Sequence, residues 1–91
     1  MESNDMGIGN DFDITTVGYL LGELGIEILT MIAQGCSNDS EIKRLSTITS
    51  SCLDIKIPLL ETLGLIRIEG DIYILAKNGV TVLKELTGWR E

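Results

Sequence analysis

The 91-residue chain contains no histidine, only two cysteines and a single proline, and aromatic residues make up 4% of it. Without histidine there is no imidazole for general base catalysis, and two thiols alone cannot complete the ligand set of a structural zinc site. Cys36 and Cys52 are therefore interpreted as reduced, partly buried thiols. No thiol and base or pair of carboxylates stands at a spacing typical of catalysis. We expect neither an enzyme nor a metal or cofactor site.

Basic residues are also scarce, because seven lysines and arginines stand against fourteen acids and give a net charge of −7. Such a field repels phosphate and disfavours avid, nonspecific binding of DNA. The acids are unevenly spread, with four of them and no base among the first sixteen residues. From Cys36 to Gly64 four acids stand against three bases, so the middle of the chain is nearly neutral.

Long apolar runs are missing as well. No uninterrupted stretch of about 18 apolar residues, the length that spans a bilayer, occurs in the sequence. The first residues are acidic where a secretory signal would be basic, so we predict a cytoplasmic protein with no membrane partner. Residues 1–13 lack apolar periodicity and are predicted to form a flexible acidic tail. Residues 14–91 are predicted to form one domain.

Apolar residues recur at three- and four-residue steps from Ile14 to Gly35, which predicts one long leading helix or two consecutive helices. The stripe consists of Val17, Leu20, Leu21, Leu24, Ile28, Leu29 and Ile32. Glycine disfavours a helix interior by about 1 kcal/mol relative to alanine, so we predict a break between Gly22 and Gly25. Gly18 and Gly22 share one face, where a helix of the same chain or of a dimer mate can pack closely.

A short second helix is predicted from Asp39 to Leu45 or Ser46. Asn38 can cap its start, and Glu41 stands where its side chain can return to the cap. The acids of the first turn suit the positive end of the helix dipole. Ile42 and Leu45 are predicted to face inward, and the helix presents Lys43 and Arg44 outward.

A third helix is predicted to begin after Thr49, a favourable N-cap, and to bury Leu53, Ile57 and Leu60 on one face. Pro58 lacks the N–H group that an interior helical residue donates, at a cost of about 3 kcal/mol. The helix therefore either kinks at Pro58, which the continuous apolar stripe favours, or splits into two helices there.

Two runs rich in isoleucine, residues 65–69 and 72–75, predict short strands joined in a tight hairpin by Gly70 and Asp71. A last helix is predicted to begin at Lys77 or Asn78 and to end at Gly88. Trp89 is predicted either to pack against the helix over residues 23–34 or to be exposed as a contact for a dimer mate or another partner. The residues of this last helix that are predicted to face inward are Val80, Leu83 and Leu86. The predicted fold class is α+β, mostly α, with three to five helices and a small two-stranded β-wing.

The chain resembles the winged helix-turn-helix transcription regulators of archaea and bacteria. The resemblance rests on LETLGLI at residues 60–66, on YILAKNG at residues 73–79, and on the apolar spacing before them at Leu45, Ile48, Thr49, Leu53 and Ile57. In the second motif Ala76 stands where the family usually has threonine. The similarity covers roughly residues 26–86 and implies a winged helix-turn-helix domain with an extra leading helix.

This resemblance implies a DNA-binding transcription regulator without a separate effector domain. On the family's pattern the outward positions of the third helix are Ser50, Ser51, Asp54, Ile55 and Pro58, with Lys56 to the side. Ser50 and Ser51 would then donate to bases or phosphates of double-stranded DNA. The charge for the DNA backbone would come from Lys43, Arg44, Lys56 and Arg67.

A second hypothesis is an acidic winged-helix module that binds another protein instead of DNA. Asp54 would repel phosphate, and Ile55 with Pro58 would form an exposed apolar pair, which suits a protein partner. A homodimer is compatible with both hypotheses. A contiguous patch of the four bases would favour DNA, whereas bases scattered among acids would favour a protein.

Overall fold

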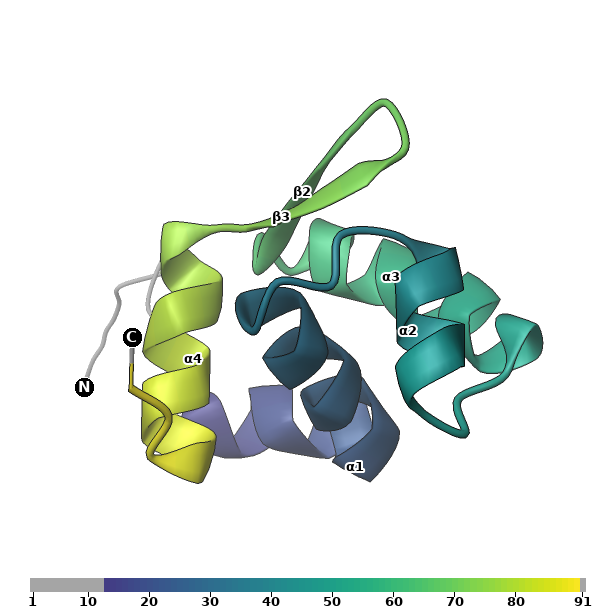
Figure 1. Cartoon of the computed structure of the whole chain (residues 1–91). Helices are drawn as coiled ribbons and strands as arrows, with labels where there is room; N and C mark the ends of the chain where they lie inside the picture. The colour runs from purple at the N-terminus through teal and green to yellow at the C-terminus, as the bar shows by residue number, and fades with distance from the viewer. Residues whose placement is uncertain (1–12, 91) are drawn as a thin grey trace, which may run out of the picture.

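Four helices and one antiparallel hairpin make up residues 13–90, the part of the chain that the computed structural model describes (Figure 1). In chain order the elements are α1 (Ile14–Ala33), α2 (Asp39–Leu45), α3 (Ser50–Thr62), β2 (Ile66–Glu69), β3 (Ile72–Leu75) and α4 (Lys77–Thr87). The predicted fold class is confirmed: the chain is a small, mostly helical α+β domain of winged-helix-like arrangement. The tail predicted for residues 1–13 lies outside the described residues apart from Asp13.

The leading helix α1 consists of two helical segments that meet at Gly22, whose φ of 68° and ψ of 179° interrupt the helix. The predicted break is therefore confirmed. Glycine adopts this conformation without the steric cost that other residues incur, so Gly22 allows α1 to bend. Asp13 caps the start of α1, because its carboxylate accepts hydrogen bonds from the backbone N–H and the hydroxyl of Thr16.

The hydrophobic core collects residues from every helix and from the start of the hairpin. Its fully buried side chains are Leu21, Ile28, Leu29, Ile42, Leu53, Leu60, Leu65, Ile66, Val82 and Leu83. The stripe predicted for α3 is confirmed, since Leu53, Ile57 and Leu60 are all buried. Trp89 and Leu86 are half-buried against this core. Within residues 13–90 no charged or polar side chain is fully buried, so apolar packing dominates the interior.

Two residues of the predicted α1 stripe lie outside the core. Leu20 and Leu24 are each 47% exposed, although the sequence predicts them in line with Leu21. The other helices pack on the opposite flank of α1, where Gly18 lies against Leu86 of α4 and Gly25 lies against Lys56 of α3. The apolar stripe of α1 is therefore wider than the face that the rest of the domain covers. The close helix packing expected at Gly18 occurs within the chain.

The other corrections concern the ends of short helices. Leu45 is predicted to face inward but is 59% exposed, because it is the last residue of α2 and the chain turns to an extended conformation at Ser46. Ile48, in the following turn, enters the core instead. In α4 the fully buried valine is Val82, whereas Val80, predicted to face inward, is only half-buried.

Gly79 explains the rotation of α4. A Cβ atom at this position would collide with the backbone carbonyl oxygen of Leu65 and with the side chain of Leu75, so only glycine allows α4 to approach the hairpin so closely. This contact turns Gly79, Val82 and Leu83 toward the core, at the three- and four-residue spacing of one helix face. The sequence shows the glycine but not the close approach that requires it.

The helix α3 begins as predicted, with the Thr49 hydroxyl accepting a hydrogen bond from the backbone N–H of Cys52 at 3.2 Å. It continues through Pro58 to Thr62 as one helix, so the alternative of two separate helices is wrong. Pro58 is exposed, and its ring faces away from the buried stripe of α3. The chain then leaves α3 through Gly64, whose φ of 76° ends the helix.

The hairpin has a simple antiparallel register, in which Ile66 pairs with Leu75 and Ile68 pairs with Tyr73. Side chains alternate between the two faces of a strand, so Ile68 and Tyr73 share one face while Arg67 lies on the other. The turn is formed by Gly70, with a φ of 63°, and by Asp71. β2 begins one residue later than the predicted strand.

Length and composition alone would allow α1 to span a membrane, and it is the one helix within residues 13–90 that passes this test. A core helix of a folded domain can be equally long and apolar. The stripe of α1 packs in the core through Val17, Leu21 and Ile28, and Gly22 interrupts the helix. The absence of a membrane partner stays a prediction.

Substituting one residue on each side of α3 tests this packing. Leu60 has no exposed surface, so Leu60→Ala should lower the free energy of unfolding by about 2 to 5 kcal/mol through lost burial and a cavity. Ile55 is 69% exposed, and Ile55→Ala should change it by no more than about 0.5 kcal/mol. Urea unfolding followed by circular dichroism measures both. Similar losses at the two positions would contradict the orientation of α3.

Candidate functional site

The exposed face of α3 is the surface that both functional hypotheses use. All five outward positions are exposed as predicted, and so are two further residues near the end of the helix: the face comprises Ser50, Ser51, Asp54, Ile55, Pro58, Glu61 and Thr62. Ile55 is 69% exposed. The face combines two carboxylates with an apolar centre and carries no base. We call it the α3 face.

Lys56, the only base in α3, is directed toward α1 and away from the α3 face. Its side chain is partly buried beside the bend of α1. A Cβ atom at Gly25 would lie 3.7 Å from Cδ of Lys56, and one at Gly22 would lie 4.0 Å from its Nζ. The glycines thus leave room for the aliphatic part of the lysine, which covers the backbone of α1.

Two of the predicted basic residues lie near the start of α3. The ammonium group of Lys43 donates a hydrogen bond to the hydroxyl of Ser50 at 2.9 Å, which links the end of α2 to the first turn of α3. Arg44 follows Lys43 in α2 and is also exposed. The structure therefore brings together two of the candidate DNA-binding residues, Lys43 and Ser50.

Arg67 lies on the outer face of the hairpin, where its guanidinium group forms an ion pair with Glu69 at 3.7 Å. Both side chains are more than half exposed, so this pair contributes no more than about 1 kcal/mol. Figure 1 shows the hairpin on one side of α3 and the bend of α1, beside which the side chain of Lys56 lies, on the other. The four predicted bases consequently do not form one contiguous patch.

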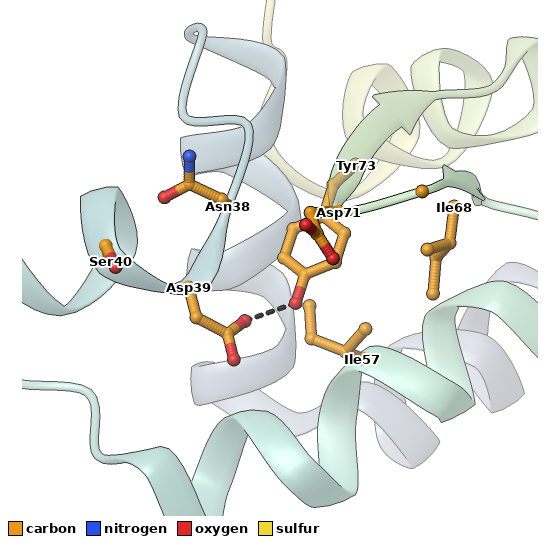
Figure 2. A pocket seen from close by; sticks show the side chains of 8 residues that line it. Asn38, Asp39, Ser40, Ile57, Ile68, Asp71 and Tyr73 are labelled. Atoms are coloured by element: carbon orange, nitrogen blue, oxygen red, sulfur yellow. Dashed lines mark hydrogen bonds between the residues drawn. The ribbon is translucent and has the colours of Figure 1, made fainter.

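A cavity of about 480 Å³ opens between the hairpin, the start of α2 and α3 (Figure 2). We call it the Tyr73 cavity; its lining residues are Asn38, Asp39, Ser40, Ile57, Ile68, Gly70, Asp71 and Tyr73. Ile57 and Ile68 supply apolar surface. The phenol hydroxyl of Tyr73 donates a hydrogen bond to the carboxylate of Asp39 (Figure 2). Three segments that are distant in sequence thus meet around one aromatic ring.

Backbone contacts hold the walls of the Tyr73 cavity in place. The N–H of Tyr73 donates to the carbonyl of Ser37 at 2.9 Å, so β3 is tied to the segment before α2. The side chain of Asn38 accepts from the N–H of Glu41, which confirms the predicted cap. The returning carboxylate of Glu41 accepts from the N–H of Ser37, one residue before the cap, at 2.7 Å. These bonds fix the turn that presents Asp39.

The electrostatic environment of Tyr73 is strongly negative. Burial raises the pKa of its hydroxyl above the usual 10.0, and the hydrogen bond to Asp39 and the negative charges of Asp39, Asp54 and Asp71 raise the pKa further. These carboxylates come from α2, from the α3 face and from the hairpin turn. The Tyr73 cavity and the α3 face therefore share one negative field.

The sequence analysis missed Tyr73 and Asp39 as site residues. The alternation of β2 and β3 could have placed Ile68 and Tyr73 on one face, because a two-residue turn fixes the register. Nothing in the local pattern shows that Asp39, 34 positions earlier in the chain, would accept the hydrogen bond of Tyr73. From the sequence alone, Asp39 is interpreted only as an acid that stabilises the first turn of a helix.

A second cavity, of about 520 Å³, lies beside the end of α2. It is lined by Glu27, Thr30, Met31, Gln34, Cys36 and Leu45. Cys36 is buried and Cys52 partly buried, and both are free thiols, in agreement with the sequence. Within residues 13–90 no group of three cysteine, aspartate or glutamate side chains could hold a metal ion.

Comparisons of the chain with protein-family models, with curated proteins and with solved structures found no match. The similarity to winged helix-turn-helix regulators therefore stays a prediction from the sequence motifs.

Removal of the Tyr73 hydroxyl tests its bond to Asp39. Tyr73→Phe should lower the free energy of unfolding by about 1 kcal/mol at neutral pH. Folding raises the pKa of Tyr73, so as the pH rises the hydroxyl loses its proton in the unfolded chain before it does so in the folded chain. The stabilisation is therefore complete below pH 10.0, the usual pKa, and is lost progressively above it. Urea unfolding at pH 7 to 11 should therefore show a steeper alkaline loss for the native chain than for Tyr73→Phe.

The matched control is Tyr19→Phe, since Tyr19 is 88% exposed. This variant should retain the alkaline loss of the native chain. An equal reduction of that loss by both substitutions would contradict the special environment of Tyr73.

Proposed function

We propose that the chain is a winged-helix-like protein-interaction module that docks its partner on the α3 face. The observation that carries this proposal is the composition of that face: Ile55 and Pro58 lie exposed between Asp54 and Glu61, and no base accompanies them. An exposed apolar centre with a polar rim is typical of protein interfaces. The direction of Lys56 toward α1 supports the proposal, because it leaves the middle of α3 without positive charge.

The charges around α3 favour a partner with basic groups beside an apolar side chain. Asp54 and Glu61 can pair with lysine or arginine at the rim, while Ile55 and Pro58 cover apolar surface of the partner. The hairpin turn adds Asp71, and the net charge of −7 steers basic partners toward the domain. The same charges oppose the approach of a phosphate backbone to the middle of α3.

DNA binding is the second candidate, and one observation favours it. Lys43 and Ser50 meet at the first turn of α3, where the recognition helix of a helix-turn-helix protein contacts DNA. Arg44 could add a further phosphate contact from α2. The sequence motifs of the regulators support the same candidate, so it is tested beside the first.

Photo-crosslinking tests the protein-interaction proposal directly. The purified chain carries p-benzoylphenylalanine in place of Ile55 and is irradiated in an extract of its source cells. We expect a discrete adduct, identified by mass spectrometry, because a residue at the centre of an interface lies within reach of the partner. The matched control carries the same group in place of Leu20, which is apolar and exposed but lies on α1.

Adducts at position 55 that do not form at position 20 are the expected result. No adduct at position 55, or the same set of adducts at both positions, would contradict docking on the α3 face.

Titration with mixed-sequence duplex DNA tests the second candidate. At about 50 mM salt even a weak electrostatic binder associates measurably. We expect no association of the native chain, because acids surround the available bases. Fluorescence anisotropy of labelled DNA measures this.

The DNA candidate would be established instead by three results together. The native chain would bind DNA less tightly as salt rises, Lys43→Glu would abolish binding, and Lys56→Glu would retain it. The two substitutions change the net charge equally, so they separate contacts near Ser50 from the general charge of the domain.

A further inference from the structure

We propose that the Tyr73 cavity receives the side chain of a lysine or arginine from a protein partner. This inference rests on the proposed function and adds a second, specific contact to the α3 face. It also states the chemistry of the partner: a positive charge at the end of an aliphatic stem. Of the residues that line the cavity, only Ile57 and Tyr73 belong to the apolar spacing and the sequence motifs on which the resemblance to winged-helix regulators rests.

The surfaces of the cavity match the two parts of such a side chain. Ile68 and the small exposed part of the largely buried Ile57 offer apolar surface to an aliphatic stem, and the ring of Tyr73 lies between Asp39 and Ile68 (Figure 2). Lysine and arginine bury their stems on apolar surface while the charged group stays near water or an acid. A cation near an aromatic ring gains a further attraction to its face.

The charges at the rim select a cation. Asp39 lies at the start of α2 and Asp71 lies in the hairpin turn, so they approach the cavity from two sides. Asp54 adds its negative field from α3, as the raised pKa of Tyr73 indicates. The base nearest in sequence to the cavity, Arg67, lies on the other face of the hairpin and pairs with Glu69. The domain therefore does not neutralise the rim with that arginine.

The carboxylates retain capacity for a ligand. Asp39 accepts the Tyr73 hydroxyl through Oδ1, which leaves Oδ2 to accept from a cationic donor. Within residues 13–90 Asp71 forms no hydrogen bond or ion pair. Asn38 contributes less, because its side-chain oxygen already accepts from the N–H of Glu41.

The cavity is large enough to receive an inserted side chain. Its volume of about 480 Å³ lies within the range of small-ligand sites, and it is open to solvent. A side chain that enters from a partner seated on the α3 face would extend along Ile57, which belongs to α3 and lines the cavity. Ile55 and Pro58 would then contact the partner beside the inserted residue.

Nuclear magnetic resonance with single amino acid probes tests the inference without the partner. The complete chain, labelled with nitrogen-15, is titrated with N-acetyl-lysine methylamide, with the arginine analogue, and with the uncharged norleucine analogue. We expect saturable shifts of backbone amides confined to the lining of the cavity, above all at Ile68, Asp71 and Tyr73, for one or both cationic probes. The norleucine probe should give no saturable shift, since it has the stem without the charge.

A pair of variants with the same change of charge locates the site. Asp71→Asn should raise the Kd of the cationic probe about two- to fivefold, the effect of one partly exposed ion pair. Glu85→Gln, at an exposed position of α4, should leave the Kd unchanged. The amide spectrum of each variant shows whether the variant is folded. If one is unfolded, the comparison of the lysine and norleucine probes on the native chain tests the inference by itself.

Three results would overturn the inference: equal binding of norleucine, equal effects of the two variants, or shifts that spread over the acidic surface without saturation. These results are distinct from failure of the proposed function. A cavity that binds the cationic probe while position 55 gives no adduct would refute docking on the α3 face alone. A specific adduct at position 55 without binding of either cationic probe would refute only the lysine or arginine site.

Discussion

Burial of the apolar stripe of α1 is the constraint on which the rest of the domain depends. The helix supplies Leu21, Ile28 and Leu29 to the core and contacts α2, α3, α4 and β3. Within residues 13–90 there is no disulfide, no candidate metal cluster and no fully buried charge to replace this packing. Each Å² of apolar surface removed from water contributes roughly 25 cal/mol, and within residues 13–90 α1 supplies five of the fifteen buried apolar residues of the core.

Packing around α1 also distributes the charges that matter for function. The bend at Gly22 and the bare backbone at Gly25 receive the side chain of Lys56, so the single base of α3 is placed against α1. What remains exposed on α3 is acidic and apolar. A structural need, the close approach of two helices, thus determines which groups a partner meets on the α3 face.

The helices and strands could be predicted well from the sequence, whereas the contacts between distant segments of the chain could not. Helix caps and glycine stops are local signals, which is why Thr49, Gly22 and Gly88 were interpreted correctly. Whether an apolar residue at the flank of a helix is covered depends on its neighbours, which explains the errors at Leu20 and Leu45. For the same reason the direction of Lys56 and the bond between Tyr73 and Asp39 could not be inferred, since each joins segments that no spacing rule connects.

The hydrogen bonds that join the hairpin to the start of α2 affect the entropy of binding. The backbone of Tyr73 is bonded to Ser37 and its hydroxyl to Asp39, so the hairpin loses its conformational freedom when the domain folds. An unattached wing would lose that entropy when a partner arrives, and the loss would subtract from affinity. Here the walls of the Tyr73 cavity are preorganised, so contacts made with them contribute to binding free energy without the cost of ordering the hairpin.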